Sequence, residues 1–221
     1  MKHRIALSLF TSRVRHDIED VREVIEIAER NLKREIKNLR ERVDNDLDSI
    51  PDKEEKKFAI GWYEDDFVRL DRVYPNIQRR ALFTTLMCIT EADLLLGCRM
   101  CKRAFDIPKE FKKRGNKRTI IQAMDYLRTH LEIRDYSFKS HWDLLQNLWL
   151  MRNAIVHNDG KPKPSERESI AKFCDSSPTI ELDSLNRIIL KEGSVQMALN
   201  AVELFFSRLI DEIKRNKLPN Q

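Results

Sequence analysis

The sequence predicts an all-α protein, and three observations carry that prediction. Apolar residues recur every three or four positions over long stretches, glycine and proline are few (5 and 7 of 221 residues), and 35% of the residues are charged. This composition is typical of long, solvent-exposed helices rather than of a β-sandwich or barrel. A chain of this length can bury one sizeable core, so we expect one compact unit.

The longest predicted helix covers residues 14–47. Its apolar residues are Val14, Ile18, Val21, Ile25, Ala28, Leu32, Ile36, Leu39, Val43 and Leu47. Spacings of three and four give one amphipathic helix of about 34 residues, roughly 50 Å long. The first six positions follow a heptad and the later ones drift toward a period of 3.6, so the helix either packs along its own domain or pairs with a partner.

Two breaks divide the N-terminal part of the chain. Residues 49–52 end the first helix, and Asp52 is a candidate cap for a second helix that runs to about Val73. Tyr74-Pro75-Asn76 is the second predicted break. We therefore expect residues 1–76 to form a long helical hairpin that is accessory to a core of residues 77–216.

The predicted core contains helices over 79–105, 120–131 (with Thr119 as cap), 140–157 and 194–214, and a short helix over 166–173. Residues 179–183 and 187–191 alternate well enough for a small β-hairpin. Glu91 lies in the middle of the most apolar helix. Because a buried carboxylate is costly without a partner, Glu91 either forms a structural salt bridge or faces solvent, or it lines a cleft.

Basic residues concentrate in one stretch. The formal charge of the chain is +5, whereas residues 99–118 alone hold nine cations against two carboxylates. The densest part is a turn-like loop with the cations Lys112, Lys113, Arg114, Lys117 and Arg118. This loop is a candidate patch for contacting an RNA backbone, and the alternative is a merely solvated loop.

Several other kinds of protein are disfavoured. The four cysteines give no disulfide framework, and neither a signal-peptide core nor an apolar run near the roughly 20 residues that span a bilayer is present, which predicts a cytoplasmic protein without membrane contact. The scattered glycines leave no place for a phosphate-binding loop. Cys98 and Cys101 lack a second pair at zinc-finger spacing, so we expect no metal and no cofactor.

Arg152, Asn153 and His157 lie at the end of the apolar helix 140–157, directly before Asn158-Asp159-Gly160. An arginine on such a helix requires an anion or a polar cleft, and Asn153 lies four residues before His157, where its amide can orient the imidazole. Arg152 and His157 are about 140° apart around an ideal helix, so two helices meeting across a two-fold axis are needed to bring both to one phosphate. The alternative is an arginine in an ion pair and a histidine that caps carbonyls.

The run Arg152-Asn153-x-x-x-His157, with Asn-Asp-Gly after it, resembles the signature of the HEPN superfamily, helical nucleic-acid-cleaving domains of bacterial toxin–antitoxin, abortive-infection and anti-phage systems. Residues 80–83, leading to Glu91, are similar to that family's first core helix with its acidic residue. Residues 123–127, followed by Trp142, are similar to the segment that precedes the motif. The resemblance covers about residues 77–216 and implies a HEPN-like helical bundle.

The resemblance implies a metal-independent endoribonuclease that serves defence or growth arrest as a homodimer, with an antitoxin or nucleotidyltransferase as a further partner. Arg152 would stabilise the phosphate, His157 would move protons at the 2′-hydroxyl or the leaving 5′-oxygen, and Asn153 would orient His157. Glu91 is a possible cleft acid. Two alternatives remain: a non-catalytic HEPN module that binds RNA, nucleotide or a protein, and a helical interaction protein that works through its N-terminal heptads.

Overall fold

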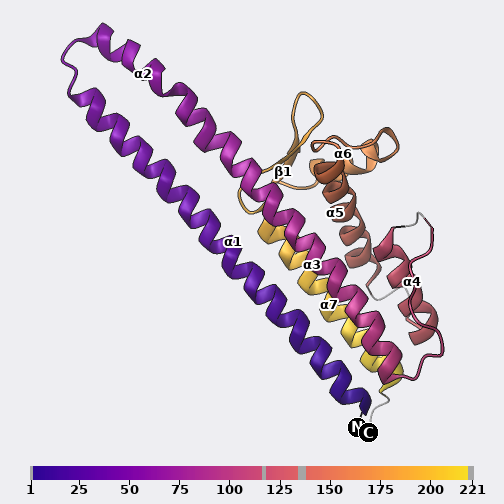
Figure 1. The fold of residues 1–221 in the computed structure, drawn as a ribbon. Coiled ribbons are helices and arrows are strands. Elements are labelled where there is room, and N and C mark those ends of the chain that lie inside the picture. The colour runs from indigo at the N-terminus through magenta and orange to yellow at the C-terminus, as the bar shows by residue number, and fades with distance from the viewer. Residues whose placement is uncertain (1, 116–117, 134–137, 219–221) are drawn as a thin grey trace.

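The computed structural model describes residues 2–115, 118–133 and 138–218, and over these it is all-α with one small β-hairpin, which confirms the predicted fold class (Figure 1). The elements are α1 (Lys2–Asp48), α2 (Lys53–Val68), α3 (Tyr74–Ala104), α4 (Thr119–Leu131), α5 (Lys139–His157), α6 (Arg167–Asp175), β1 (Ile180–Leu182), β2 (Ile188–Leu190) and α7 (Ser194–Lys217). Helices α1, α3 and α7 lie side by side, and α4, α5 and α6 pack beyond α3 (Figure 1).

Helix α1 is longer than predicted because its apolar face begins before Val14. Leu7 and Phe10 are buried and extend the same stripe toward the N-terminus. The Phe10 ring meets Phe206 of α7 edge-on, with centroids 6.2 Å apart, and it also covers Gly97 of α3, where a Cβ would lie 2.9 Å from the ring. The N-terminal half of α1 therefore belongs to the main core, in agreement with intramolecular packing.

The second half of α1 and all of α2 extend beyond this core as a two-helix arm (Figure 1). Leu39, Val43 and Ala59 are buried in the arm, whereas Phe58 and Trp62 are 70% and 65% exposed. The arm begins where Arg79 of α3 donates two hydrogen bonds of 2.7 Å to the carboxylate of Glu29 in α1.

The predicted break at Tyr74-Pro75-Asn76 is wrong, because α2 continues into α3 through one π-helical turn, η1 (Arg69–Val73). The amide of Tyr74 donates to the carbonyl of Arg69, five residues earlier. Pro75 then occupies the first turn of α3, where its missing N–H is tolerated and the wider turn accommodates the ring. The expected division between residues 76 and 77 therefore falls inside one continuous helical run.

This run, Lys53–Ala104, includes an 18-residue stretch that is apolar enough by length and composition alone to cross a membrane, with a mean hydropathy of 1.5. The apolar runs in the sequence did not predict such a stretch. In the fold, 44% of that stretch is buried against other parts of the protein. Core helices of soluble proteins pass the same test of length and composition, so the run gives only weak support for a membrane span.

The C-terminal elements follow the predicted bounds closely. Helices α5 and α7 begin and end within three residues of the expected positions, and β1 pairs antiparallel with β2 with Ile180 opposite Leu190. Helix α4 differs in one detail: Thr119 is its first helical residue, and Arg118 takes the cap position without a side-chain cap bond. Trp142 of α5 packs on Phe205 of α7 at 5.8 Å, which fixes α5 against the core.

Candidate active site

Arg152 lies on the half-buried side of α5, facing α3. Its neighbours Trp149 and Met151 are buried, so the core holds this turn of the helix in place. The guanidinium carbon lies 5.4 Å from the centre of the Trp149 ring, and Nη2 donates to the sulfur of Cys88 in α3 at 3.5 Å. The arginine is thus located between two helices rather than extended into solvent.

The Arg152 guanidinium has no carboxylate partner within the described part of the chain. Nη1 donates to Oδ1 of Asn153 at 3.2 Å, Nη2 meets only the thiol of Cys88, and Nε is buried without a hydrogen bond. A partly desolvated cation without a counterion favours an anionic ligand. The alternative of an arginine held in an ion pair is therefore not observed among these residues.

Asn153 is hydrogen-bonded to Arg152, not to His157. The sequence predicted that the amide would orient the imidazole four residues later. In the folded chain the Asn153 oxygen accepts from Arg152 instead, and over the described residues no hydrogen bond joins Asn153 to His157. In a single chain Asn153 therefore positions the arginine.

His157 is the last residue of α5, and its side chain is exposed. The helix ends as predicted, because the amides of Asn158 and Gly160 both donate to the carbonyl of Ala154, at 3.0 and 2.9 Å. Asp159 and Gly160 adopt positive φ values of 49° and 80°. Backbone amides thus satisfy the Ala154 carbonyl, and the described hydrogen bonds include none from the imidazole to this helix end.

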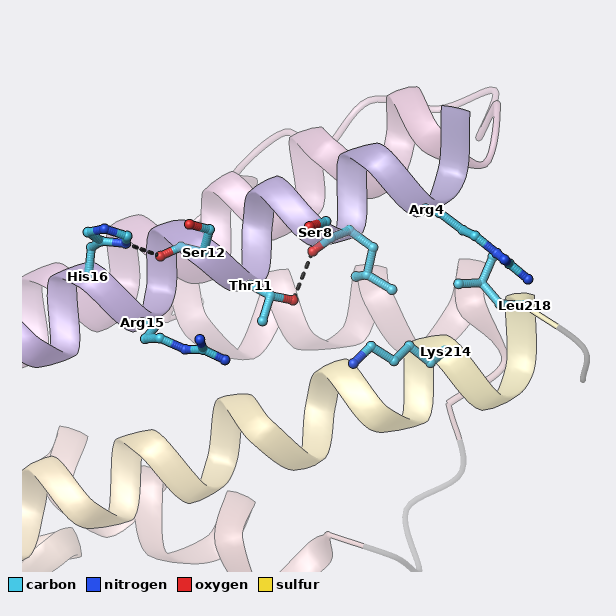
Figure 2. Close-up of a pocket in the computed structure, with 9 residues that line it drawn as sticks. Arg4, Ser8, Thr11, Ser12, Arg15, His16, Lys214 and Leu218 are labelled. Atoms are coloured by element: carbon cyan, nitrogen blue, oxygen red, sulfur yellow. Dashed lines mark hydrogen bonds between the residues drawn. The ribbon is translucent and has the colours of Figure 1, made fainter. Parts of the chain in front are cut away.

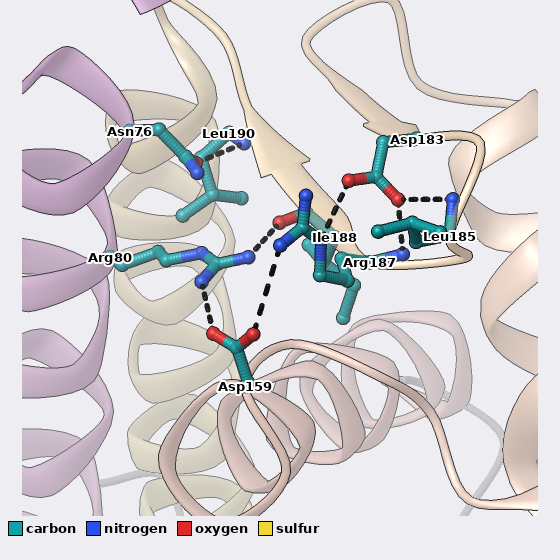
Figure 3. Close-up of polar contacts among 8 residues, drawn as sticks. All are labelled: Asn76, Arg80, Asp159, Asp183, Leu185, Arg187, Ile188 and Leu190. Carbon is teal, nitrogen blue, oxygen red and sulfur yellow. Dashed lines mark hydrogen bonds and ion pairs between the residues drawn. The ribbon is translucent and has the colours of Figure 1, made fainter. Parts of the chain in front are cut away.

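A polar network that the sequence did not predict holds the turn after His157 (Figure 3). Arg80 of α3 donates from Nη2 to the carbonyl of Ile188 at 2.8 Å, and its Nη1 lies 3.3 Å from Oδ1 of Asp159. The Gly160 carbonyl accepts from the amide of Ile188 at 3.0 Å. In the sequence, this network was indicated only by an arginine on an apolar helix, which does not show which residues the arginine contacts.

The hairpin side of this network has hydrogen bonds of its own. The carboxylate of Asp183 accepts hydrogen bonds of 2.8 Å from the backbone amides of Arg187 and Leu185 and from the Arg187 side chain. The bond from the Arg187 backbone is the main cause that holds the pKa of Asp183 below its ordinary value. Arg187 also reaches Asp159 at 3.8 Å, so the hairpin contributes a second cation to the turn.

Glu91 is half-buried on α3, three residues after Cys88. Residues at this spacing share a helix face, so Glu91 lies on the side of α3 that meets Arg152. Within the described ranges it makes no ion pair, and the expected structural salt bridge is not found there. Its role as a cleft acid stays a prediction.

The predicted RNA-contacting loop is only partly free. Lys112, Lys113 and Arg114 are exposed and form no ion pair over residues 2–115, 118–133 and 138–218. Arg118, by contrast, is half-buried and pairs with Glu166 at 2.6 Å, because the end of the loop packs against the segment before α6. Lys117 lies outside the described residues.

A second basic surface lies between the first turns of α1 and the last turns of α7 (Figure 2). This groove of about 690 Å³ has cations on both helices and no carboxylate in its lining. The cations are Arg4, Arg15 and Lys214, accompanied by His16 and the hydroxyls of Ser8, Thr11 and Ser12. The sequence could not indicate it, because its two walls are about 200 residues apart.

Over the described residues, no group of three or more histidine, cysteine or acidic side chains is arranged to hold a metal ion. Cys98 and Cys101 are buried thiols, and burial raises the pKa of each to about 12. Cys98 donates to the carbonyl of Ala123 at 3.5 Å, as a structural thiol does.

No family model matches this chain, and the searches of curated proteins and of solved structures return no significant match.

Proposed function

We propose that this protein is a metal-independent endoribonuclease whose reaction depends on Arg152 and His157. The observation that carries the proposal is the half-buried Arg152 guanidinium, which has no carboxylate partner in the described chain. Five residues later, the same helix ends in an exposed histidine. A cation for the phosphate and a group that exchanges protons near neutral pH suit phosphodiester cleavage, and the HEPN-like motif supports the same reading.

The proposed site is shared by two copies of the chain. Around an ideal helix Arg152 and His157 point about 140° apart, so one α5 does not bring both to one phosphate. Val156, beside His157, is 42% exposed, and Ile77, one turn before Arg80, is 60% exposed. Exposed apolar side chains beside His157 and beside the arginine that contacts the following turn favour self-association, in which each chain supplies one arginine and one histidine.

In the proposed reaction the 2′-oxygen attacks the adjacent phosphorus as the bond to the 5′-oxygen breaks. One His157 takes the proton of the 2′-hydroxyl, and the other His157 gives a proton to the leaving 5′-oxygen. Arg152 stabilises the negative charge that builds on the phosphate. The products are a 2′,3′-cyclic phosphate and a 5′-hydroxyl, and DNA is not cleaved because it lacks the nucleophile.

The biological setting is proposed from the HEPN resemblance alone. By that likeness the enzyme acts in the cytoplasm in anti-phage defence or growth arrest, and an antitoxin or nucleotidyltransferase partner controls it.

The test is incubation of end-labelled single-stranded RNA with the purified protein in excess EDTA. Arg152→Ala and His157→Ala are expected to abolish cleavage, whereas His141→Ala, at the opposite end of α5, keeps it. DNA of the same sequence stays intact. Cleavage that survives in either site variant, or that EDTA abolishes, would refute the mechanism.

A non-catalytic module that binds RNA, nucleotide or a protein partner is the second candidate. It is favoured by the Arg152–Asn153 hydrogen bond, which leaves His157 without a polar partner among the described residues. This candidate is supported over the nuclease if a dimeric protein binds RNA and leaves it intact. Binding should then be lost in Arg152→Ala and kept in His157→Ala.

A further inference from the structure

The basic loop and α4 line an open, shallow pocket of about 800 Å³ that is separate from Arg152 and His157. Three rings line it in a row: Phe111 meets Tyr126 with centroids 5.8 Å apart, and Tyr126 meets His130 at 4.7 Å. All three side chains are half-buried, so part of each ring remains accessible. Neighbouring rings meet at 80° and 61°, edge to face, so a flat ligand can stack on the face of one ring at a time.

Two hydrogen bonds attach the loop to α4. The Tyr126 hydroxyl donates to the carbonyl of Lys109 at 2.8 Å, and the amide of Arg114 donates to Oε1 of Gln122 at 2.7 Å. These bonds bracket Phe111 on both sides in the sequence and hold its ring against Tyr126. The pocket therefore exists before a ligand arrives, which reduces the entropy lost on binding.

The rim of the pocket is mainly basic. Lys109, Lys112 and Arg114 lie on the loop side, against the carboxylates of Glu110 and Asp125. Lys113 lies between two of these cations in the sequence and is also exposed. Rings beside several exposed cations match the two components of a nucleotide chain, a flat base and a charged phosphate.

We propose that this pocket is a subsite for single-stranded RNA, in which an unpaired base stacks on the face of Phe111, beside Tyr126, while Lys112 and Arg114 contact the flanking phosphates. Stacking needs an unstacked base, so a single strand binds and a duplex does not. The inference rests on the proposed function for the identity of the ligand. The Arg118–Glu166 ion pair connects the loop to the segment that follows His157.

The experiment measures binding of a short fluorescent single-stranded RNA by anisotropy over a series of salt concentrations. The parent protein carries His157→Ala so that the RNA stays intact. Phe111→Ala is expected to weaken binding about tenfold without changing the salt dependence, because it removes stacking and no charge. Phe111→Tyr restores binding. Phe58→Ala, which removes an exposed ring of α2, is the matched control and has no effect.

Charge is tested separately. The double variant Lys112→Ala/Arg114→Ala is expected to reduce the slope of log affinity against log salt by about 1.4, since each lost phosphate contact on a single strand contributes about 0.7. Arg15→Ala/Lys214→Ala removes two cations from the groove between α1 and α7 and leaves the slope unchanged. Equal losses in the two double variants would mean that binding reflects only the general positive charge, and would overturn the subsite.

Photocrosslinking covers the case in which Phe111→Ala perturbs folding. RNA that contains 4-thiouridine is expected to crosslink to peptides carrying Phe111 or Tyr126, and crosslinks confined to other peptides overturn the proposal. Failure of the subsite proposal is distinguishable from failure of the proposed nuclease activity. If RNA is cleaved in EDTA and Phe111→Ala leaves KM unchanged, the subsite alone is refuted. If RNA binding depends on Phe111 but no cleavage occurs, the nuclease activity alone is refuted.

Discussion

The guanidinium of Arg80 and the carboxylate of Asp159 lie 3.3 Å apart, joining α3 to the turn directly after His157 (Figure 3). The same guanidinium donates to the Ile188 carbonyl at 2.8 Å, so one side chain links a core helix, the turn and the hairpin. This link ties the turn that follows His157 to the core.

Arg80→Ala is predicted to lower the free energy of unfolding by about 1–3 kcal/mol, because the partly buried Ile188 carbonyl loses its side-chain donor and Asp159 loses its nearest cation. Urea denaturation measures the change. Arg187→Ala is the comparison: it removes a more exposed side chain that pairs with Asp183 at the surface and reaches Asp159 only at 3.8 Å, so a smaller loss is expected. Equal destabilisation by the two variants would contradict the leading role given to Arg80.

Gly160→Ala is predicted to destabilise the protein by about 1–2 kcal/mol, because a left-handed backbone strains any residue with a Cβ. Gly160 has φ of 80°, and its Cβ would lie 2.5 Å from the Arg80 guanidinium that holds the turn. Gly61→Ala is the control: it lies in α2 with open space around it, and alanine there is expected to stabilise the helix by about 0.5–1 kcal/mol. Thermal unfolding of both variants tests the contrast in sign.

Asp93 is predicted to make the protein less stable as pH rises. Its side chain is 4% exposed and lies beside Asp17, which pairs with Arg13 at 2.8 Å. Burial, with a smaller contribution from Asp17, raises the pKa of Asp93 from 3.8 to about 7. The folded state thus keeps a proton that the unfolded state releases, so the free energy of unfolding decreases from about pH 4 to about pH 7.

Asp93→Asn is expected to flatten this part of the stability profile, because the amide cannot ionise. Asp125→Asn, an exposed position on α4, should keep the parent profile. Urea unfolding between pH 4 and pH 8 gives the comparison. A parent protein whose stability rises over this range, with Asp93→Asn unchanged from it, would rule out the buried acid as the cause.

Cys88 is predicted to be the thiol that a maleimide modifies first. It is exposed, whereas burial raises the pKa of Cys98 and Cys101 to about 12 and that of Cys174 to about 11, so those three present little thiolate. An adduct on Cys88 displaces its contact with Arg152 and is expected to block RNA cleavage. Peptide mass spectrometry identifies the site, and Cys88→Ser should remain active and resist inhibition. Inhibition of the Cys88→Ser variant would assign the effect elsewhere.

Helices α5 and α7 lie within three residues of their predicted bounds. Helix α7 keeps one apolar and one polar face over its whole length, and α5 ends directly before Asn158-Asp159-Gly160. Signals between near neighbours in the sequence were therefore enough to predict where both helices lie. Pro75 misled the prediction because a proline usually ends a helix. The π-helical turn Arg69–Val73 removes the clash, and it is not visible in apolar spacing.

The sequence by itself determined the all-α class, the helix that carries Arg152 and His157, and the glycine that ends it. These depend on interactions within about four residues along the chain, which periodicity records directly. The partners of the polar groups were decided only by the tertiary structure: Arg80 with Asp159, Asp93 with Asp17, and Arg152 with Cys88. These pairs are 64 to 79 residues apart in the chain. They form because packing between helices, which spacing within one helix cannot record, brings the side chains together.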